Sequence, residues 1–441
     1  MSPAVERARQ RIAAQKAQLP LMYGGVDFDR QPERFTDDPA FAVVRDRAPL
    51  GVRVTDEEIE LVRAYAMLGD VVADAYAALM PKYGFRGLIA MLVQACDQGI
   101  EAVENAPPEL AAFIAAMEAT PDWVDMDLVA EGARLDRNAT ANLAPFAIRG
   151  AFIATFLNKY SALPMALTGT LSNDTAARRV NETATFFATT VLPGALERRG
   201  EGFKAAAMVR LMHSMVRFNA LRSGRWDSAV YGVPIPQVDQ MPAGLIPIFL
   251  MAFKIVGQGR REFTADERAQ VELARYRCFL LGLPEDLLAT TPEGIVRIMT
   301  ARNSTLRHGF DDETCGELIR ATLSAYLPAS RAPMARLHNV IEKSFAKAFF
   351  LRQFLKGDRA AAQRMGVPIS GLDRAVFALV AAGIGLRMAA YRWAAKVPGL
   401  RGPADAALVR KIHALLARYG HAEFTSDAEA YRPTPGVRAA A

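Results

Sequence analysis

A histidine in the middle of an expected helix is the residue of this sequence best placed to do chemistry. His213 stands in the run Val209-Arg210-Leu211-Met212-His213-Ser214-Met215-Val216-Arg217. Residues three, four and seven positions away share a helix face with it, and here they are small or slim: Ala206, Val209, Val216 and Ala220. Such a face leaves room for a flat macrocycle whose metal the imidazole could ligate, because bulky neighbours would hold the two apart.

Two arginines flank this histidine on the same helix. Arg210 precedes it by three positions and Arg217 follows it by four, so both lie about one turn away. Guanidinium groups bind carboxylates such as propionates in a bidentate way. The spacing therefore predicts that Arg210 or Arg217 anchors acidic substituents of a macrocycle. A histidine hydrogen-bonded to a neighbouring helix in an ordinary core fits the same spacing, so the residues alone leave both interpretations open.

A second helical segment combines a cation, a hydroxyl and aromatic bulk. In Arg179-Val180-Asn181-Glu182-Thr183 the first and last residues are four apart and so share a side of the helix. Phe186, Phe187 and Thr190 continue that segment. It could form one wall of a pocket for a small polar ligand. A polar helix start followed by an aromatic core stripe is the alternative, and spacing does not separate the two.

Most familiar catalytic and metal-binding patterns are absent. The sequence holds no P-loop, no strand followed by a dinucleotide-type glycine turn, no nucleophile elbow and no His-Glu-x-x-His. It also lacks the Glu-x-x-His pairs of a di-iron helical bundle. Ser344 and Lys347 have Ser-x-x-Lys spacing without its companion motifs, which favours a solvated helix face.

The remaining histidines and the cysteines add no site. The other four histidines lie in polar or charged stretches and are expected at the surface or at helix ends: His308, His338, His413 and His421. The three cysteines are far apart and match neither a disulfide framework nor a metal-binding spacing: Cys96, Cys278 and Cys315. Because no Cys-x-x-Cys-His motif is present, any haem would be held non-covalently.

The elements that must position these residues are helices. Ala, Leu, Arg and Glu are abundant and runs of β-branched residues are scarce, which predicts an all-α protein. Thr55 and Thr264 each begin a capping box, and the first opens a long helix expected to reach toward Tyr76. Thr291 precedes a proline at the first helical position. Further helices are expected over residues 86–104, 125–139, 145–157, 174–192, 202–222, 313–327, 334–354, 373–396 and 404–419.

The expected organisation is one large domain with short extensions. Residues 1–50 are rich in Pro, Asp and Arg and are expected to form an extended N-terminal arm. Residues 51–420 are expected to form a single helical domain, because apolar helices continue on both sides of every loop. Residues 421–441 are expected to be a loose C-terminal tail.

Charge and hydropathy limit the kinds of binding partner and the cellular location that we expect. The net charge of +6 comes from Lys and Arg spread among nearly as many Asp and Glu, so no nucleic-acid surface is expected. The N-terminus lacks the apolar stretch typical of a signal peptide, and the longest apolar run, residues 375–386, is too short to cross a bilayer. We therefore expect a cytoplasmic protein. Residues 243–253 and 375–386 are apolar enough for peripheral membrane contact.

At the two chemical segments the sequence resembles the haem oxygenase family that includes bacterial latex-clearing protein, the rubber oxygenase, and the mycophenolic acid pathway oxygenase MpaB. The specific part covers roughly Leu163 to Ala252. Four motifs occur there in order: Arg179–Thr183; Pro193-Gly194-Ala195-Leu196; Val209-Arg210-Leu211-Met212-His213 with Val216-Arg217; and Tyr231-Gly232-Val233-Pro234-Ile235-Pro236-Gln237.

The resemblance implies an all-α, globin-like core around one b-type haem, with His213 as the proximal iron ligand. The slim Val209 and Val216 would then lie beside the ring, as their spacing from His213 indicates. Arg179 and Thr183 match polar residues on the distal side of that haem. The relatives cleave or oxidise isoprenoid chains with dioxygen. Dioxygen and an apolar, isoprenoid or lipid-like small molecule are therefore the expected substrates.

Two departures from the family pattern bear on mechanism. Latex-clearing proteins have a lysine before the distal threonine, where this sequence has Glu182. They also use an upstream glutamate as a base, whereas no Asp or Glu occurs here between Asp136 and Asp174. Polyisoprene cleavage by the same mechanism is thus not expected. We hypothesise that Glu182 takes over acid–base work with its pKa raised by apolar surroundings; pairing with Arg178 or Arg179, or exposure to solvent, is the alternative.

Two rival functions remain open at the level of sequence. The absence of the upstream carboxylate favours a non-catalytic haem or gas-binding protein on the same scaffold. The apolar stretches favour a haem-free helical protein that binds lipid, with His213 as a core residue only.

Overall fold

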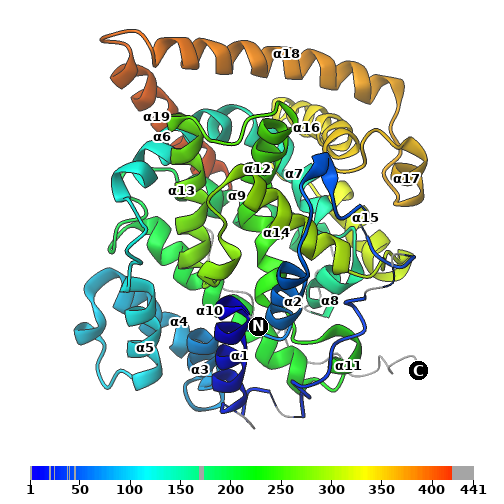
Figure 1. Cartoon of the computed structure of the whole chain (residues 1–441). Coiled ribbons are helices and arrows are strands. Elements are labelled where there is room, and N and C mark those ends of the chain that lie inside the picture. Colours follow the sequence, from blue (N-terminus) through cyan, green and yellow to red (C-terminus); the bar gives the residue numbers. More distant parts are fainter. Residues whose placement is uncertain are drawn as a thin grey trace. The chain divides into compact units, whose positions relative to one another are not determined.

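The computed structural model describes residues 2–18, 21–23, 25–36, 38, 40–43, 46–167 and 173–419 of the chain. Nearly every element in these residues is a helix (Figure 1). Extended pairing in this part of the chain is confined to two isolated bridges, Phe35 with Leu306 and Ala42 with Arg307. The predicted all-α class is confirmed.

The described residues divide into two compact units. One contains residues up to 132 together with 197–308, and the other contains 133–196 together with 309–419. A single domain over residues 51–420 was expected from the sequence. Each unit is assembled from separate stretches of chain, so no one linker marks a boundary that composition could show.

The first unit carries the histidine helix. Its α-helices are α1 (Pro3–Lys16), α2 (Asp56–Tyr65), α3 (Val71–Ala77), α4 (Met80–Gln98), α5 (Pro108–Glu118), α10 (Glu201–Arg222), α11 (Ser228–Tyr231), α12 (Gln237–Gly257), α13 (Ala265–Leu280) and α14 (Pro292–Thr305). Three 3-10 turns, η1 (Pro49–Gly51), η2 (Ile100–Ala102) and η3 (Glu285–Leu287), connect them. Helix α6 (Met126–Asn142) begins in this unit and ends in the other.

The second unit carries the segment with Arg179 and Thr183. It comprises α7 (Ala144–Ala154), α8 (Lys159–Leu167), α9 (Asn173–Thr189), the π-helical turn η4 (Asp312–Gly316), α15 (Glu317–Ser324), α16 (Pro333–Gln353), α17 (Arg359–Arg364), α18 (Gly371–Ala394) and α19 (Arg401–Tyr419). Its main core lies among α7, α9, α15 and α16, where Phe152, Val180, Ile319 and Phe350 pack together. The helix expected over 313–327 is thus divided into η4 and α15.

The N-terminal segment departs from the extended arm that was expected. Residues 3–16 form α1, because the Ser2 hydroxyl accepts a hydrogen bond from the Val5 amide (3.3 Å) and Pro3 suits the first helical position. Val5, Ala8 and Gln15 are buried. The expected C-terminal tail, residues 421–441, lies outside the described residues.

The single long helix expected from Thr55 to Tyr76 is two helices. The capping box at Thr55 forms as predicted, but α2 ends at Tyr65 and Asp70 caps a new helix, α3, by accepting from the Ala73 amide (3.2 Å). Between them, a Cβ on Gly69 would lie 2.6 Å from Asp74 Oδ2 and 2.7 Å from Arg217 Nε. Only glycine permits this close approach, and the break is what brings two aspartates to α10.

Candidate functional site

Helix α10 is buried on almost every side. Of its 22 residues, 15 are buried, and the expected bounds of 202–222 are correct to within one residue. His213 stands near its middle and is half-buried, whereas His308, His338 and His413 are exposed. Among the histidines that the structure describes, His213 is therefore set apart by its position.

A chain of side-chain amides holds the His213 ring. Gln237, at the start of α12, donates from Nε2 to the carbonyl of Gly69 at 2.9 Å. Gln240 donates from Nε2 to Gln237 Oε1 at 3.3 Å, and its own Oε1 lies 3.4 Å from His213 Nδ1. The Gly69 carbonyl can only accept, so it fixes the direction of every bond along the chain.

This direction determines the tautomer of the imidazole. Because Gln240 presents its oxygen, His213 Nδ1 carries the proton and donates it. In the neutral ring Nε2 then has a lone pair, which is the form of histidine that ligates a metal. The arrangement has the composition of a metal-ligand histidine with its second nitrogen oriented by the protein.

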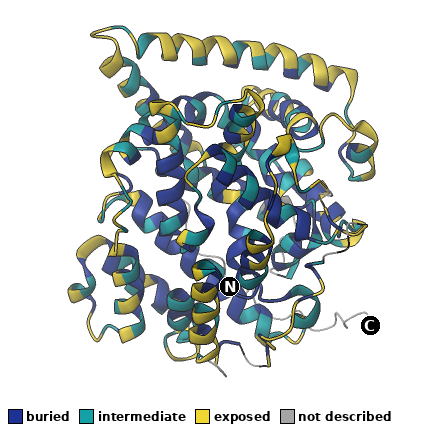
Figure 2. Cartoon of the chain, in the orientation of Figure 1, coloured by how far each residue is buried: buried dark blue, intermediate teal, exposed yellow. Residues whose placement is uncertain are grey.

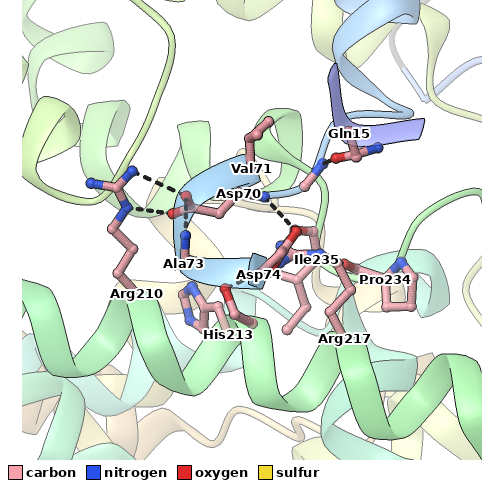
Figure 3. A network of polar contacts seen from close by, with 12 residues as sticks. Gln15, Asp70, Val71, Ala73, Asp74, Arg210, His213, Arg217, Pro234 and Ile235 are labelled. Atoms are coloured by element: carbon pink, nitrogen blue, oxygen red, sulfur yellow. Dashed lines mark hydrogen bonds and ion pairs between the residues drawn. The ribbon is translucent and has the colours of Figure 1, made fainter. Parts of the chain in front are cut away.

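Arg217 is fully buried and bound on all sides. It forms an ion pair with Asp74 and donates to the carbonyls of Pro234 (2.9 Å) and Ile235 (2.6 Å). Asp74 also accepts from the Tyr23 hydroxyl. Figure 3 shows Arg217 and Asp74 facing one another between α10 and α3. The charge of Arg217 is thus balanced inside the protein.

Arg210, one helical turn before His213, is likewise paired with a buried aspartate. It forms a bidentate pair with Asp70, which includes a 3.0 Å bond from Nη2 to Oδ1, and its guanidinium stacks over Phe113. Figure 3 shows Arg210, His213 and Arg217 rising from the same side of α10. Arg210 or Arg217 was predicted to anchor propionates, and that role stays a prediction; here each binds a buried aspartate and fastens α10 to α3.

Sequence reasoning missed Asp70 and Asp74. A signal was present, since two aspartates four residues apart share a face and stand among apolar residues of an expected helix. Buried carboxylates in such a setting require cationic partners. The two arginines spaced seven apart on the histidine helix supply them.

The glycine–proline turn after α10 has a clear structural purpose. Gly232 has a φ of +69°, and a Cβ there would lie 2.9 Å from Pro32 Cγ. The turn presents the carbonyls of Pro234 and Ile235 to Arg217 and then starts α12 at Gln237. It therefore sets the register that puts Gln240 beside His213.

Three of the four slim residues on the helix face of His213 are buried. Ala206, Val216 and Ala220 are buried, while Val209 is half-buried like His213 itself. Their predicted place beside a macrocycle ring stays a prediction.

Helix α9, in the second unit, has buried apolar residues on one side and half-buried polar residues beside them. Val180 and Ala184 are buried on one side, and Arg179, Glu182 and Thr183 are half-buried. Further along, Phe186 and Phe187 contact one another edge to face, with ring centroids 5.3 Å apart. The predicted grouping of a cation, a hydroxyl, a carboxyl and aromatic bulk on one helix is present; the assigned roles stay predictions.

Glu182 is the titratable group on α9 with the clearest perturbation. Burial raises its pKa above the ordinary value, against the opposing effects of Arg179 and then Arg178. In the described part of the chain its carboxylate has no hydrogen bond or ion pair. A carboxyl group in this state holds its proton to higher pH than an exposed glutamate does.

The chain matches a known family over most of its length. Residues 104–386 match the model for the catalytic domain of the ER-bound oxygenase mpaB/B′ and rubber oxygenase family. An all-α oxygenase catalytic domain is thus the class to which fold and site belong. The chain is a member of the mpaB/rubber oxygenase family, as the motifs around His213 predicted.

A solved structure agrees on the fold. Latex clearing protein in its closed state superposes with a TM-score of 0.55 at 18% identity, covering 86% of this chain and 95% of that one. At this identity the likeness concerns fold alone. No curated protein matches the sequence significantly.

Proposed function

We propose that this protein is a b-type haem-dependent oxygenase that uses dioxygen to oxidise an apolar, isoprenoid or lipid-like small molecule. Membership of an oxygenase family supplies the reaction class. The observation that carries the haem assignment is the amide chain from Gly69 through Gln237 and Gln240 to His213 Nδ1. It leaves the imidazole in the tautomer that ligates iron.

The residues around His213 fit such a group. An imidazole is the usual proximal ligand of b-type haem, and slim residues lie on its helix face, with Val209 half-buried beside it. A haem would supply a redox-active iron that reacts with dioxygen. Arg210 and Arg217 are committed to Asp70 and Asp74, so we assign them to holding α10 in place rather than to binding propionates.

The acid–base work is assigned to α9. We place Glu182 there as the group that accepts and returns a proton of the substrate, because burial raises its pKa above the ordinary value and so makes its carboxylate a stronger base. Thr183 offers a hydroxyl that can donate to an oxygen atom, and Arg179 a fixed positive charge that favours a developing anion. These roles rest on the family resemblance together with the chemistry of the three side chains.

The proposal is tested by the absorption spectrum of the purified protein, before and after addition of hemin. The unaltered protein is expected to give a Soret band that the His213→Ala variant loses or shifts. His413→Ala is the matched control, since His413 is an exposed histidine and should leave the band unchanged. External imidazole should restore the band of the unaltered protein to the His213→Ala protein, because it can take the place of the missing side chain.

Absence of a Soret band in the unaltered protein, even with hemin present, would overturn the haem assignment. It would leave a helical lipid-binding protein as the better interpretation.

A second candidate function is haem or gas binding without turnover. The lack of any Asp or Glu between Asp136 and Asp174 favours it, because the family's upstream base is missing. Oxygen-electrode measurements with farnesyl and geranylgeranyl compounds separate the two: substrate-dependent oxygen uptake supports the oxygenase, and reversible binding of carbon monoxide without uptake supports the binding protein.

A further inference from the structure

Helix α18 exposes a continuous apolar face. Leu372, Leu379, Leu386 and Trp393 follow at intervals of seven and are 70%, 77%, 74% and 64% exposed. Residues at this interval lie above one another on a helix, with alanines between them here. Figure 2 shows α18 exposed along its length. Single exposed leucines are ordinary, but a row of large apolar side chains along one helix of about 36 Å marks an interaction surface.

The opposite face of α18 fixes the orientation of this row. Phe377 and Ile384 are buried, and the Phe377 ring stacks on Phe345 of α16 with centroids 4.7 Å apart. At the start of the helix, Lys347 donates to Asp373 at 3.1 Å. Because α16 holds one side of α18, the leucine row faces outward, and lipid could not surround the helix.

Charge identifies the chemistry that this face accepts. No charged residue occurs from 375 to 386. Exposed basic residues stand at both ends of that stretch, namely Arg374, Arg387, Arg392, Lys396 and Arg401. The one acidic residue between 371 and 402 is Asp373, which is buried and paired with Lys347. The surface thus combines an apolar centre with cations at its margins.

This combination disfavours a second copy of the chain. Two α18 faces packed together would bring arginines of both copies close without an acidic residue to offset them, and such like-charge contact opposes association. An anionic phospholipid surface complements both features: acyl chains accept the leucine row and phosphates accept the arginines. Indole rings such as that of Trp393 also concentrate at this boundary.

We propose that α18 binds the surface of a membrane that contains anionic phospholipids, lying in the headgroup region with Leu379 and Leu386 inserted. Length and composition alone would let α18, and also α12, cross a bilayer. Packing of Phe377 and Ile384 on the protein keeps α18 parallel to the surface instead. This attachment is independent of the oxygenase proposal and would bring the protein to a source of apolar molecules.

The test is co-sedimentation of the full-length protein with vesicles of phosphatidylcholine alone or mixed with phosphatidylglycerol. The unaltered protein is expected to bind the mixed vesicles and to lose binding as salt increases. Leu379→Ser/Leu386→Ser should weaken partitioning at least about tenfold. Arg387→Gln/Arg392→Gln should weaken it on mixed vesicles by about fivefold for each charge removed.

Leu21→Ser is the matched control, since Leu21 is an exposed leucine of the other unit and should not affect binding. Vesicles carrying brominated lipid should quench Trp393, an effect that Trp393→Phe abolishes and Trp226→Phe preserves. Failure of the unaltered protein to bind mixed vesicles would overturn the proposal, as would equal binding by the Leu379→Ser/Leu386→Ser variant. A dimer that this double variant dissociates, without vesicle binding, would identify a second copy as the occupant.

Discussion

Helices α10 and α9 carry the chemical groups of this protein in opposite ways. On α10 each of the two buried arginines has a built-in counter-charge: Arg217 has Asp74 and Arg210 has Asp70. On α9, Glu182 is largely withdrawn from water, yet no carboxylate bond of it is found in the described residues. One helix has its charges fixed by folding, whereas the other keeps a group that can still change its protonation.

This difference distinguishes groups that stabilise the structure from groups that can take part in a reaction. A buried ion pair with all its hydrogen bonds satisfied makes a rigid support, because losing either member leaves an uncompensated charge. A half-buried carboxyl with a raised pKa does not add comparable rigidity, and desolvation of its carboxylate form destabilises the fold. Groups perturbed in this way are concentrated at functional sites. The comparison therefore predicts stability effects from α10 and its aspartates, and effects on turnover and proton uptake from α9.

The largest effect is expected from removing the partner of Arg217. Asp74→Ala leaves a fully buried guanidinium without its carboxylate, so the free energy of unfolding should fall by about 3–5 kcal/mol in urea titrations. The control is Asp97→Ala, which breaks the more exposed pair with Lys204 (2.9 Å) and should cost less than about 1 kcal/mol. A loss for Asp74→Ala no larger than that of the control would remove the distinction between the two helices.

Glu182→Gln should have the reverse profile. The amide keeps the shape of the side chain but cannot carry a proton, so turnover should fall by about a hundredfold or more. Stability should be unchanged or slightly higher, because a destabilised carboxylate is gone. Haem content and the Soret band should match those of the unaltered protein. Turnover at the original rate with full haem content would show that Glu182 is a bystander.

Gln240 is expected to affect haem binding through its contact with His213. Gln240→Ala removes the acceptor of His213 Nδ1, so haem affinity should fall by about 10–100-fold, which hemin titration measures. Gln240→Glu retains an acceptor of greater basicity and should recover affinity while lowering the reduction potential of the iron. Equal affinity for all three proteins would mean that the amide chain does not orient the ligand.

The sequence predicts much of this arrangement and misses a definable part. Thr55, Thr264 and Thr291 cap helices as expected, because capping is local chemistry within four residues. The break at Gly69 was missed, since it depends on Arg217, which approaches Gly69 from a distant part of the chain. His213 was selected because its helix face is unusual, and its role as a ligand stays a prediction.

The role expected of Arg210 and Arg217 depended on knowing their partners. Spacing along α10 correctly put both on the side of His213, but it could not show that Asp70 and Asp74 occupy them. Gln240 was missed for the same reason, since it lies 27 residues beyond the histidine. Tertiary partners of buried polar groups are the part that local patterns leave out.

The smallest effect is expected from Arg178, and it tests the assignment of Glu182 most finely. With its pKa raised in the folded state, Glu182 binds more protons in the folded than in the unfolded protein between pH 4.5 and its folded pKa. Its contribution to stability therefore falls as the pH rises through that window. Arg178 is exposed and lowers the pKa of Glu182, so Arg178→Ala should move the decline in stability to higher pH.

Unfolding free energies across pH, measured for Arg178→Ala in the presence and absence of Glu182→Gln, isolate this effect from other titrating groups. Arg179→Ala should give the larger displacement, because Arg179 opposes the raised pKa more strongly than Arg178 does. If the pH curves of the Arg178→Ala proteins coincide with and without Glu182→Gln, Glu182 is not the titrating group. The paired charges of α10 could then no longer be contrasted with a titrating group on α9, and another carboxyl group would have to account for the pH dependence.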